Sequence, residues 1–230
     1  MSERQRSFQA PITYFYEEGK ANLEECMKLS FEASLAHDIK KLVIFTAVGE
    51  GVKLAIEEYL GLAEYSETQV IAVSFSNGRV PVNISAEDED LFRSKGISIV
   101  RAHMPFNPIL GTFQERGVAQ GLSLLASVLE TFCGSMSLCV QAVLMACDAG
   151  HVEPGEHVIA LTSDTSVLVR ACPTTYFLSD FIIREVLCKP VLLTIGKREG
   201  QPENDEEEDS SSRIAEAAAN TEPKILPPGC

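Results

Sequence analysis

The stretch that decides the fold is KKLVIFTAVGEGVKLAIEEYL, residues 40–60. Residues 41–46 form a nearly continuous apolar run, which is typical of a strand covered on both faces. Gly49 and Gly51 break this run, and residues 52–60 are expected to form a helix. A strand, a glycine-containing loop and a helix in this order indicate an α/β protein.

The rest of the chain repeats this alternation. Four further stretches have the composition of strands, at residues 70–75, 97–101, 157–161 and 166–171. Helices are expected at residues 23–35, 86–94, 116–132, 136–148 and 176–186. Shorter extended pieces are expected at residues 14–16 and 190–194, and a long loop at 102–115. This pattern predicts a three-layer α/β/α sandwich with a mostly parallel sheet.

Local signals set several boundaries. The turn at residues 162–165 is short, so the strands on either side of it are expected to be antiparallel neighbours. Asn22, with Glu25 three residues later, predicts a capping box at the start of the first helix. Ser85 is the expected N-cap of the helix at 86–94, which Gly96 ends.

Composition divides the chain into three parts: a loose arm at residues 1–12, the α/β domain at 13–196 and an acidic tail at 197–230. Within the tail, residues 201–212 (QPENDEEEDSSS) contain no apolar side chain. Such a segment buries too little surface to offset the entropy of ordering it, so the tail is expected to be disordered.

The chain carries 19 basic and 33 acidic residues, a net charge of −14. A body this acidic repels phosphate backbones and anionic lipids, so neither nucleic acid nor a membrane surface is an expected partner. The seven cysteines show no metal-ligand spacing, the N-terminus has no secretory apolar region, and no apolar run is long enough to cross a membrane. A reducing cytoplasmic location is therefore expected.

The loop of residues 46–51 is the leading candidate ligand site. It follows a strand at its carboxyl end and opens a helix, whose first N–H groups and partial positive charge attract anions. The predicted binding groups are those of Thr46, Ala47, Val48, Gly49 and Gly51. A plain strand-to-helix turn that requires glycine is the alternative, because the loop matches neither the Walker A nor the GxGxxG pattern. The acidic residue between the two glycines either stabilises the helix start or repels a phosphate.

The chain also resembles a known family. The stretch at residues 40–60 is similar to the strand, loop and helix of the pyruvate kinase C-terminal domain, and more similar to the stand-alone proteins that resemble this domain. The most specific stretches are YFYEEGKANLEECMKLSFEA at 14–33, RSKGISIVRAH at 93–103, LCVQAVLMACDAG at 138–150 and REVLCKP at 184–190. The resemblance runs from about Tyr14 to Pro190. It implies a five-stranded mixed sheet between helices, with the last strand antiparallel.

The resemblance also implies a ligand, because the loop of the pyruvate kinase domain holds a sugar phosphate and some stand-alone relatives hold FMN. It therefore points to a phosphate-bearing small molecule, with FMN as the candidate cofactor, at residues 46–51. The chain departs from the family pattern in three places. The family loop has more hydroxyl groups where this chain has Ala47 and Gly51, a glycine- and arginine-rich stretch is shortened to residues 162–164, and a family glutamate is Gln141 here.

Further candidates lie at the ends of other predicted elements. Arg101 and His103 follow the third strand and could meet a phosphate, although a surface arginine and a packed histidine are the alternative. Asp148 could bind a ligand hydroxyl or help to end a helix. Asp164 and Thr165 match a family pair and are also ordinary turn residues. Arg116 could bind an anion or be solvated, whereas Cys139, Val143 and Cys147 form an expected core stripe.

Three functions remain open: a module that binds a phosphorylated small molecule or FMN, a flavin-dependent oxidoreductase, and a protein-interaction domain that has lost its ligand. No nucleophile with a neighbouring base, no HExxH motif and no paired carboxylates occur in the sequence. Pyruvate kinase activity is not expected, because it needs a barrel domain for which 230 residues leave no room. The apolar positions of the first and last predicted helices would suit a homodimer.

Overall fold

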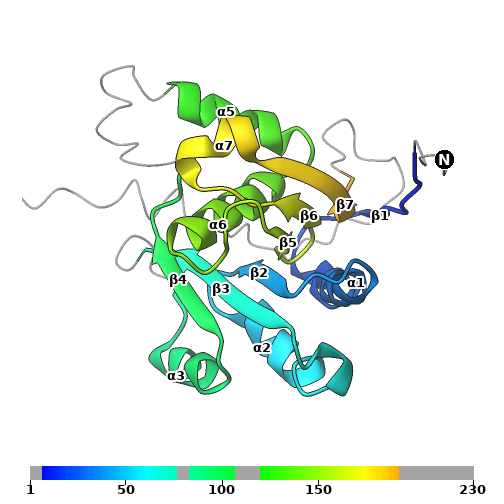
Figure 1. Ribbon diagram of the computed structural model, residues 1–230, viewed down its shortest axis with the longest axis vertical. Helices are drawn as coiled ribbons and strands as arrows, with labels where there is room; N and C mark the ends of the chain where they lie inside the picture. Colours follow the sequence, from blue (N-terminus) through cyan, green and yellow to red (C-terminus); the bar gives the residue numbers. More distant parts are fainter. Residues whose placement is uncertain (1–6, 77–82, 107–119, 192–230) are drawn as a thin grey trace, which may run out of the picture. The chain divides into compact units, whose positions relative to one another are not determined.

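A mixed sheet of seven strands forms the centre of the computed structural model, in the order β1-β7-β6-β5-β2-β3-β4 (Figure 1). The structure describes residues 7–76, 83–106 and 120–191. The strands are β1 (Thr13–Phe15), β2 (Lys41–Phe45), β3 (Gln69–Phe75), β4 (Ser98–Ala102), β5 (His157–Leu161), β6 (Ser166–Arg170) and β7 (Ile182–Pro190). The longer helices are α1 (Leu23–Ala36), α2 (Glu50–Glu58), α3 (Ala86–Ser94), α5 (Gln120–Glu130) and α6 (Met136–Asp148).

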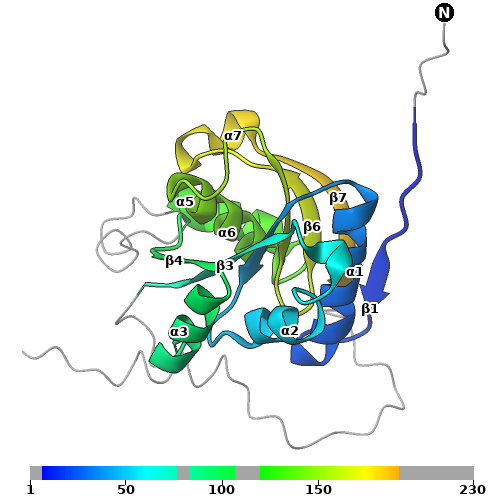
Figure 2. The same cartoon turned by 60° about the horizontal axis from the view of Figure 1, so that its bottom comes forward.

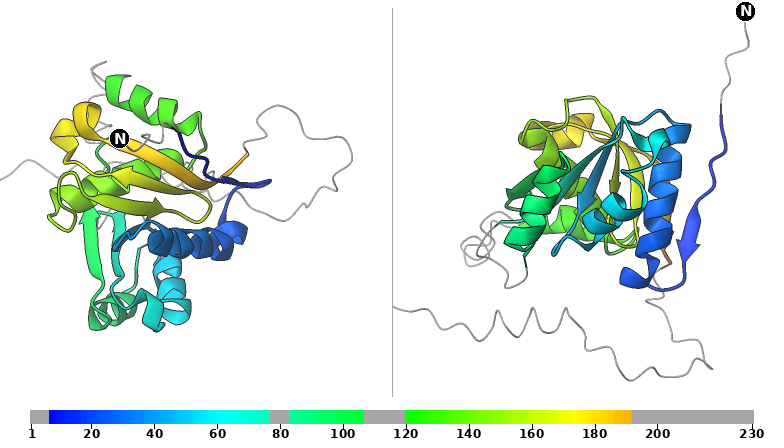
Figure 3. Two further views of the ribbon diagram at one scale, coloured as in Figure 1. Left: turned by 45° about the vertical axis from the view of Figure 1, so that its right-hand side comes forward. Right: turned by 90° about the horizontal axis from the view of Figure 1, so that it is seen from below.

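The sheet is mostly parallel. Strand β2 is parallel to β3 and to β5, and β3 is parallel to β4, so these four strands end at the same edge of the sheet. Only β6 runs the other way, because it pairs antiparallel with both β5 and β7. Strand β1 adds three residues beside the end of β7 (Figure 3). We call the edge at which β2 to β5 end the carboxyl edge.

Helices α1, α2 and α3 cover one face of the sheet (Figure 2). Their apolar side chains pack on Leu42 and Ile44 of β2, and Phe31 and Phe92 are the largest side chains that this layer buries completely. Burial of aromatic and aliphatic surface of this size is the main source of stability in a domain. We call this side of the sheet the α1–α3 face.

Helix α6 covers the opposite face, with α5 packed against it. It meets Val43 and Phe45, the β2 residues that alternate with those on the α1–α3 face. Both faces of β2 are therefore buried, which explains its continuous apolar run. Cys139, Val143 and Cys147 lie in this core as predicted. The prediction of an α/β fold with helices around a largely parallel sheet is confirmed in this form.

The predicted number of five strands is wrong. Residues 176–186 were expected to form a helix, but only Phe177–Asp180 is α-helical, and Ile182–Pro190 is strand β7. The β-branched side chains in this segment suit a strand, and pairing with the exposed edge of β6 supplies its hydrogen bonds. The antiparallel strand predicted at 166–171 is β6, but two further strands follow it in the sheet.

The two predicted helix caps had different outcomes. Ser85 caps α3 as predicted, since its side chain accepts a hydrogen bond of 3.1 Å from the N–H of Asp88. The prediction of a capping box at Asn22 is wrong, because the Asn22 side chain makes no hydrogen bond with the first turn of α1. Its side chain instead donates to the carbonyl oxygen of Glu17 at 2.7 Å, because a 3-10 turn at Lys20–Asn22 precedes α1.

Several predictions fall outside the described residues. They are the disordered tail at 197–230, most of the loop at 102–115, the start of the helix at 116–132, and Arg116. Residues 7–12 of the predicted arm are exposed and have no regular secondary structure. In the described ranges, no helix combines the length and the apolar character that a membrane span requires.

Candidate functional site

The loop of residues 46–51 leaves the carboxyl edge at β2 and enters α2. The N–H of Thr46 donates to the carbonyl oxygen of Val73 at 2.9 Å, which extends the pairing of β2 with β3 by one residue. The Thr46 hydroxyl accepts a hydrogen bond of 2.9 Å from the N–H of Gly49. Thr46 is buried and closes the turn, while Ala47 and Val48 are half-buried at its tip.

Both glycines of the loop have packing reasons. Gly49 has a φ of +93°, and a Cβ atom there would lie 2.9 Å from Cζ of Phe92. A Cβ atom at Gly51 would lie 3.2 Å from Cγ2 of Ile44. Gly49 is therefore required by its backbone conformation and by Phe92, and Gly51 fits tight packing against Ile44, so the presence of these glycines alone is no evidence for a ligand.

The first turn of α2 presents backbone N–H groups at the carboxyl edge. Those of Glu50, Gly51 and Val52 have no hydrogen-bond acceptor in the described part of the chain, as is usual for a helix start. The Glu50 side chain forms an exposed ion pair of 2.8 Å with Lys20. This pair partly neutralises the negative charge that would oppose an anion.

Ser74 lies beside Thr46 on the neighbouring strand. Phe45 pairs with Val73, so the next residues of the two parallel strands, Thr46 and Ser74, are in register. Ala72 faces the α1–α3 side, and side chains alternate along a strand, so Ser74 faces the same side. Ser74 is 0% exposed, and its hydroxyl has no hydrogen-bond partner among the described residues. A buried hydroxyl without a partner costs about 1–3 kcal/mol, so this one requires an explanation.

Arg101 continues the row on β4. It pairs in register with Ser74, so Thr46, Ser74 and Arg101 lie side by side on adjacent strands. We call these three residues the edge row. The fold therefore brings together two predicted binding residues, and it adds a serine between them.

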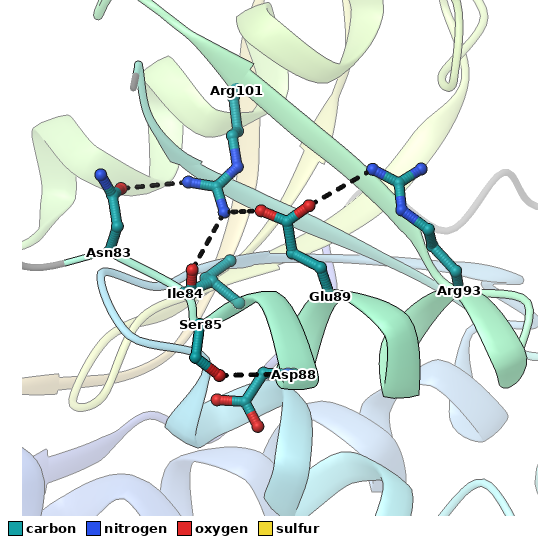
Figure 4. Close-up of polar contacts among 7 residues, drawn as sticks. All are labelled: Asn83, Ile84, Ser85, Asp88, Glu89, Arg93 and Arg101. Atoms are coloured by element: carbon teal, nitrogen blue, oxygen red, sulfur yellow. Dashed lines mark hydrogen bonds and ion pairs between the residues drawn. The ribbon is translucent and has the colours of Figure 1, made fainter. Parts of the chain in front are cut away.

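The Arg101 guanidinium is held by groups on the α1–α3 face (Figure 4). It donates to Oδ1 of Asn83 at 3.0 Å and to the carbonyl oxygen of Ile84 at 3.3 Å. It also forms a close ion pair with Glu89 of α3. Arg101 is thus not the solvated surface residue of the alternative; it ties α3 and the segment before it to β4.

His103 lies farther along the same edge. Its Nδ1 is 3.4 Å from the hydroxyl of Ser76; His103 is exposed and Ser76 is half-buried. His103 is two residues beyond Arg101 on the chain and therefore lies outside the edge row. Most of the following loop lies outside the described residues, so the packing of His103 under it stays a prediction.

The turn between β5 and β6 forms a second polar cluster at the carboxyl edge. Asp164 is 3% exposed, and its carboxylate accepts hydrogen bonds from the hydroxyls of Thr162 and Thr165 at 3.3 and 3.0 Å. The Thr162 hydroxyl in turn accepts from the N–H of Thr165 at 3.2 Å. Asp164 and Thr165 therefore stabilise their own turn, which is the turn-residue alternative considered for them.

Gly19 and Lys20, which precede α1, connect this turn to the loop of residues 46–51. The N–H of Gly19 donates to Asp164 at 2.8 Å, and the ammonium group of Lys20 pairs with Glu50. Strands β2 and β5 are also neighbours in the sheet. Their carboxyl ends mark the point at which the order of the sheet changes direction, where open α/β sheets bind ligands.

Asp148 lies away from this cluster. It ends α6, which leads to the opposite end of β5, so Asp148 is at the amino edge of the parallel strands. Its carboxylate accepts from the N–H and the hydroxyl of Thr174, at 2.9 and 2.5 Å. The predicted site residue Asp148 is therefore not brought together with the others; it caps the 3-10 turn at Thr174–Tyr176.

The cysteines of the described residues are reduced and buried. Burial raises the pKa of Cys139 well above its ordinary value, and the hydrogen bond with Cys188, together with burial, raises that of Cys26. Thiols with raised pKa values are poor nucleophiles. Within the described ranges, no group of three or more His, Cys, Asp or Glu side chains is arranged to hold a metal ion.

Sequence reasoning missed Ser74, Glu89 and Gly19. Ser74 carries the one available signal, since it is the polar residue near the end of the buried run VIAVSF at 70–75. The register of β2 with β3 is needed to place it beside Thr46. The contacts of Glu89 with Arg101 and of Gly19 with Asp164 have no local signal, because these partners lie 12 and 145 residues apart along the chain.

No protein-family model matches the chain. Among solved structures, that of pyruvate kinase from Cryptosporidium parvum is similar to it at 14% sequence identity and a TM-score of 0.34. The match covers 68% of this chain and 24% of the pyruvate kinase. The chain thus corresponds to about a quarter of that enzyme's length, and the similarity is a distant resemblance of fold.

Proposed function

We propose that this protein is a ligand-binding α/β domain that holds a phosphate-bearing small molecule over the edge row and the first turn of α2. In this proposal it is related to the stand-alone proteins that resemble the pyruvate kinase C-terminal domain, and FMN is the first ligand to test. The unpartnered hydroxyl of Ser74 is the observation that carries the proposal.

A ligand oxygen would account for this hydroxyl. Ser74 lies next to the N-terminus of α2 through Thr46, whose own hydroxyl closes the turn into that helix. In folded proteins nearly all buried polar side chains have a partner. A serine that keeps a 0% exposed hydroxyl without one is better explained by a partner that binds there than by packing, since alanine would fill the same position without cost.

The neighbouring groups suit a phosphate. The N–H groups of Glu50, Gly51 and Val52 and the positive end of α2 favour an anion at this point. Arg101, at the end of the edge row, supplies a guanidinium that matches phosphate oxygens in geometry. The ion pair of Glu50 with Lys20 limits the repulsion from the one acidic side chain in the turn.

The test is FMN binding to the full chain and to Ser74→Ala. A visible spectrum of the purified protein detects co-purified flavin, and titration with FMN gives the affinity. We expect Ser74→Ala to weaken FMN binding about tenfold, the effect of one hydrogen bond to a charged oxygen. Without ligand the variant should be as stable as the wild type or more so, because it loses an unsatisfied hydroxyl.

Ser34→Ala is the matched control. Ser34 is also buried, but it donates to the carbonyl oxygen of Phe31 at 2.7 Å and lies in the last turn of α1, near the start of β2. Its replacement should lower stability and leave FMN affinity unchanged. A colourless protein that shows no thermal shift with FMN or with sugar phosphates would contradict the proposal.

A second candidate function is a protein-interaction domain that has lost its ligand. The packing contacts of Gly49 with Phe92 and of Gly51 with Ile44 favour it, since they explain the loop without any ligand.

If flavin is bound, anaerobic titration with NAD(P)H distinguishes two further cases. The flavin of an oxidoreductase is reduced, and the flavin of a binding module is not. We propose a cytoplasmic location, which the free thiols of the six described cysteines support.

A further inference from the structure

We infer that Arg101 is an anion-exchange residue: its guanidinium pairs with Glu89 in this structure, and an organic phosphate takes the place of Glu89, which keeps its ion pair with Arg93. This inference rests on the proposed function and specifies how the same site selects an anionic ligand. It assigns roles to Glu89 and Arg93, two residues of α3 that lie outside the edge row.

The position of Arg101 is the first support. It is in register with Ser74, whose own neighbour on β2 is Thr46, so the guanidinium extends from the same face and the same edge as the unpartnered hydroxyl. The Arg101 side chain is 13% exposed. Because Arg101 and Ser74 are paired residues of adjacent strands, one ligand at this edge could contact both side chains.

The present partners of Arg101 connect it to the loop itself. The carbonyl oxygen of Ile84 accepts from the guanidinium at 3.3 Å, and Cγ2 of Ile84 would lie 3.7 Å from a Cβ atom at Gly49. Residue Ile84 therefore touches both Arg101 and the turn into α2. The Arg101 guanidinium is thus connected through Ile84 to the turn over which the phosphate is proposed to bind.

Glu89 has two cationic partners, which makes the exchange possible. Its Oε1 meets Arg101, and its Oε2 meets Arg93 one helical turn later at 3.5 Å (Figure 4). The Arg93 side chain is 64% exposed, so it can follow the carboxylate. Removal of one partner from a partly buried ion pair is costly when a charge stays unpaired, but here each charge would keep a partner.

The exchange suits an organic phosphate rather than a neutral ligand. Arginine binds phosphate through two parallel N–H donors, and this interaction is about twice as strong as a hydrogen bond between neutral groups. A neutral ligand offers Arg101 nothing to replace the Glu89 carboxylate. The ion pair of Arg101 with Glu89 therefore favours anionic ligands over neutral ones at this site.

The experiment measures FMN and inorganic phosphate binding by calorimetry for the wild type and for Glu89→Gln, Arg93→Gln and Arg101→Gln. Glu89→Gln removes the competing carboxylate and should tighten FMN binding about tenfold. Arg93→Gln leaves Glu89 with Arg101 alone and should weaken binding several-fold. Arg101→Gln should weaken it more than tenfold.

Glu87→Gln is the matched control, since it changes the same net charge on an exposed side chain of the same helix. Equal affinities of Glu89→Gln and Glu87→Gln, in a protein that binds FMN and loses it in Ser74→Ala, would overturn the exchange and leave the proposed function standing. If neither the wild type nor any variant binds FMN or phosphate, both are overturned. Should Arg101→Gln fail to fold, the opposite effects expected for Glu89→Gln and Arg93→Gln still decide the question.

Discussion

The backbone N–H of Gly19 donates a hydrogen bond of 2.8 Å to the buried carboxylate of Asp164, across 145 residues of sequence. This contact attaches the lead-in of α1 to the turn between β5 and β6. Through Lys20 and Glu50, the same lead-in also reaches the start of α2. Asp164 is therefore a structural residue of the carboxyl edge, and its proposed role in ligand binding is indirect.

Replacement of Asp164 by alanine should lower the free energy of unfolding by about 3 kcal/mol. Three donors, Gly19 N–H and the hydroxyls of Thr162 and Thr165, would lose a shared acceptor that is 3% exposed. Urea denaturation measures the loss. Asp90→Ala, which removes an exposed carboxyl from α3, should change stability by less than about 0.5 kcal/mol. Equal effects of the two variants would show that the Asp164 contacts contribute nothing.

Gly49→Ala should lower the free energy of unfolding of the protein. Both the positive φ and the distance of 2.9 Å from the new Cβ atom to Phe92 oppose it, and we expect a loss of about 2–3 kcal/mol. Gly96→Ala is the control for the backbone term, because Gly96 has a φ of +75° and open space around it, and it should cost about 1 kcal/mol. Urea midpoints of the two variants separate the clash from the φ strain. A smaller loss for Gly49→Ala than for Gly96→Ala would contradict the packing explanation.

Asp148→Ala should reduce stability by about 1 kcal/mol and leave ligand affinity unchanged. The carboxylate caps the turn at Thr174, and it lies at the amino edge of the parallel strands. Thermal unfolding and an FMN titration on the same samples check the two expectations. A loss of FMN affinity without a loss of stability would show that Asp148 contributes to ligand binding and would contradict the structural role.

Stability should fall as the pH rises above 9. Burial raises the pKa of the Cys147 thiol from 9.0 to about 11, so between these values the unfolded chain releases a proton that the folded chain keeps. The folded state binds more protons in this window, and its stabilisation, complete below pH 9, is lost as the pH passes through 11. Cys26, Cys133, Cys139 and Cys172, whose pKa values are also raised, act in the same direction.

Urea denaturation at pH 8, 9, 10 and 11 measures this dependence. Cys147→Ala removes one of the contributing thiols, so its stability should fall less steeply with pH than that of the wild type. Parallel curves for the two proteins would exclude a contribution from Cys147.

Local signals predicted most of the fold. The continuous apolar run of β2, the Ser85 cap of α3 and the short turn between β5 and β6 each report a local physical requirement, and all three are confirmed. The segment 176–186 was predicted incorrectly because its conformation depends on pairing with the edge of strand β6. Its side chains fit a helix or a strand, and the open hydrogen-bonding groups of β6 select the strand.

The candidate site was only partly predictable, and the difference has a physical reason. The sequence by itself determined the α/β class and the strand, loop and helix around Thr46, because these depend on interactions between near neighbours along the chain. Only the tertiary structure decided that Ser74 and Arg101 stand in one row with Thr46, that Glu89 holds the arginine, and that Asp148 lies at the other edge. These relationships depend on strand register and on the side of the sheet that each helix covers, which are set by the packing of the whole core and by no local pattern.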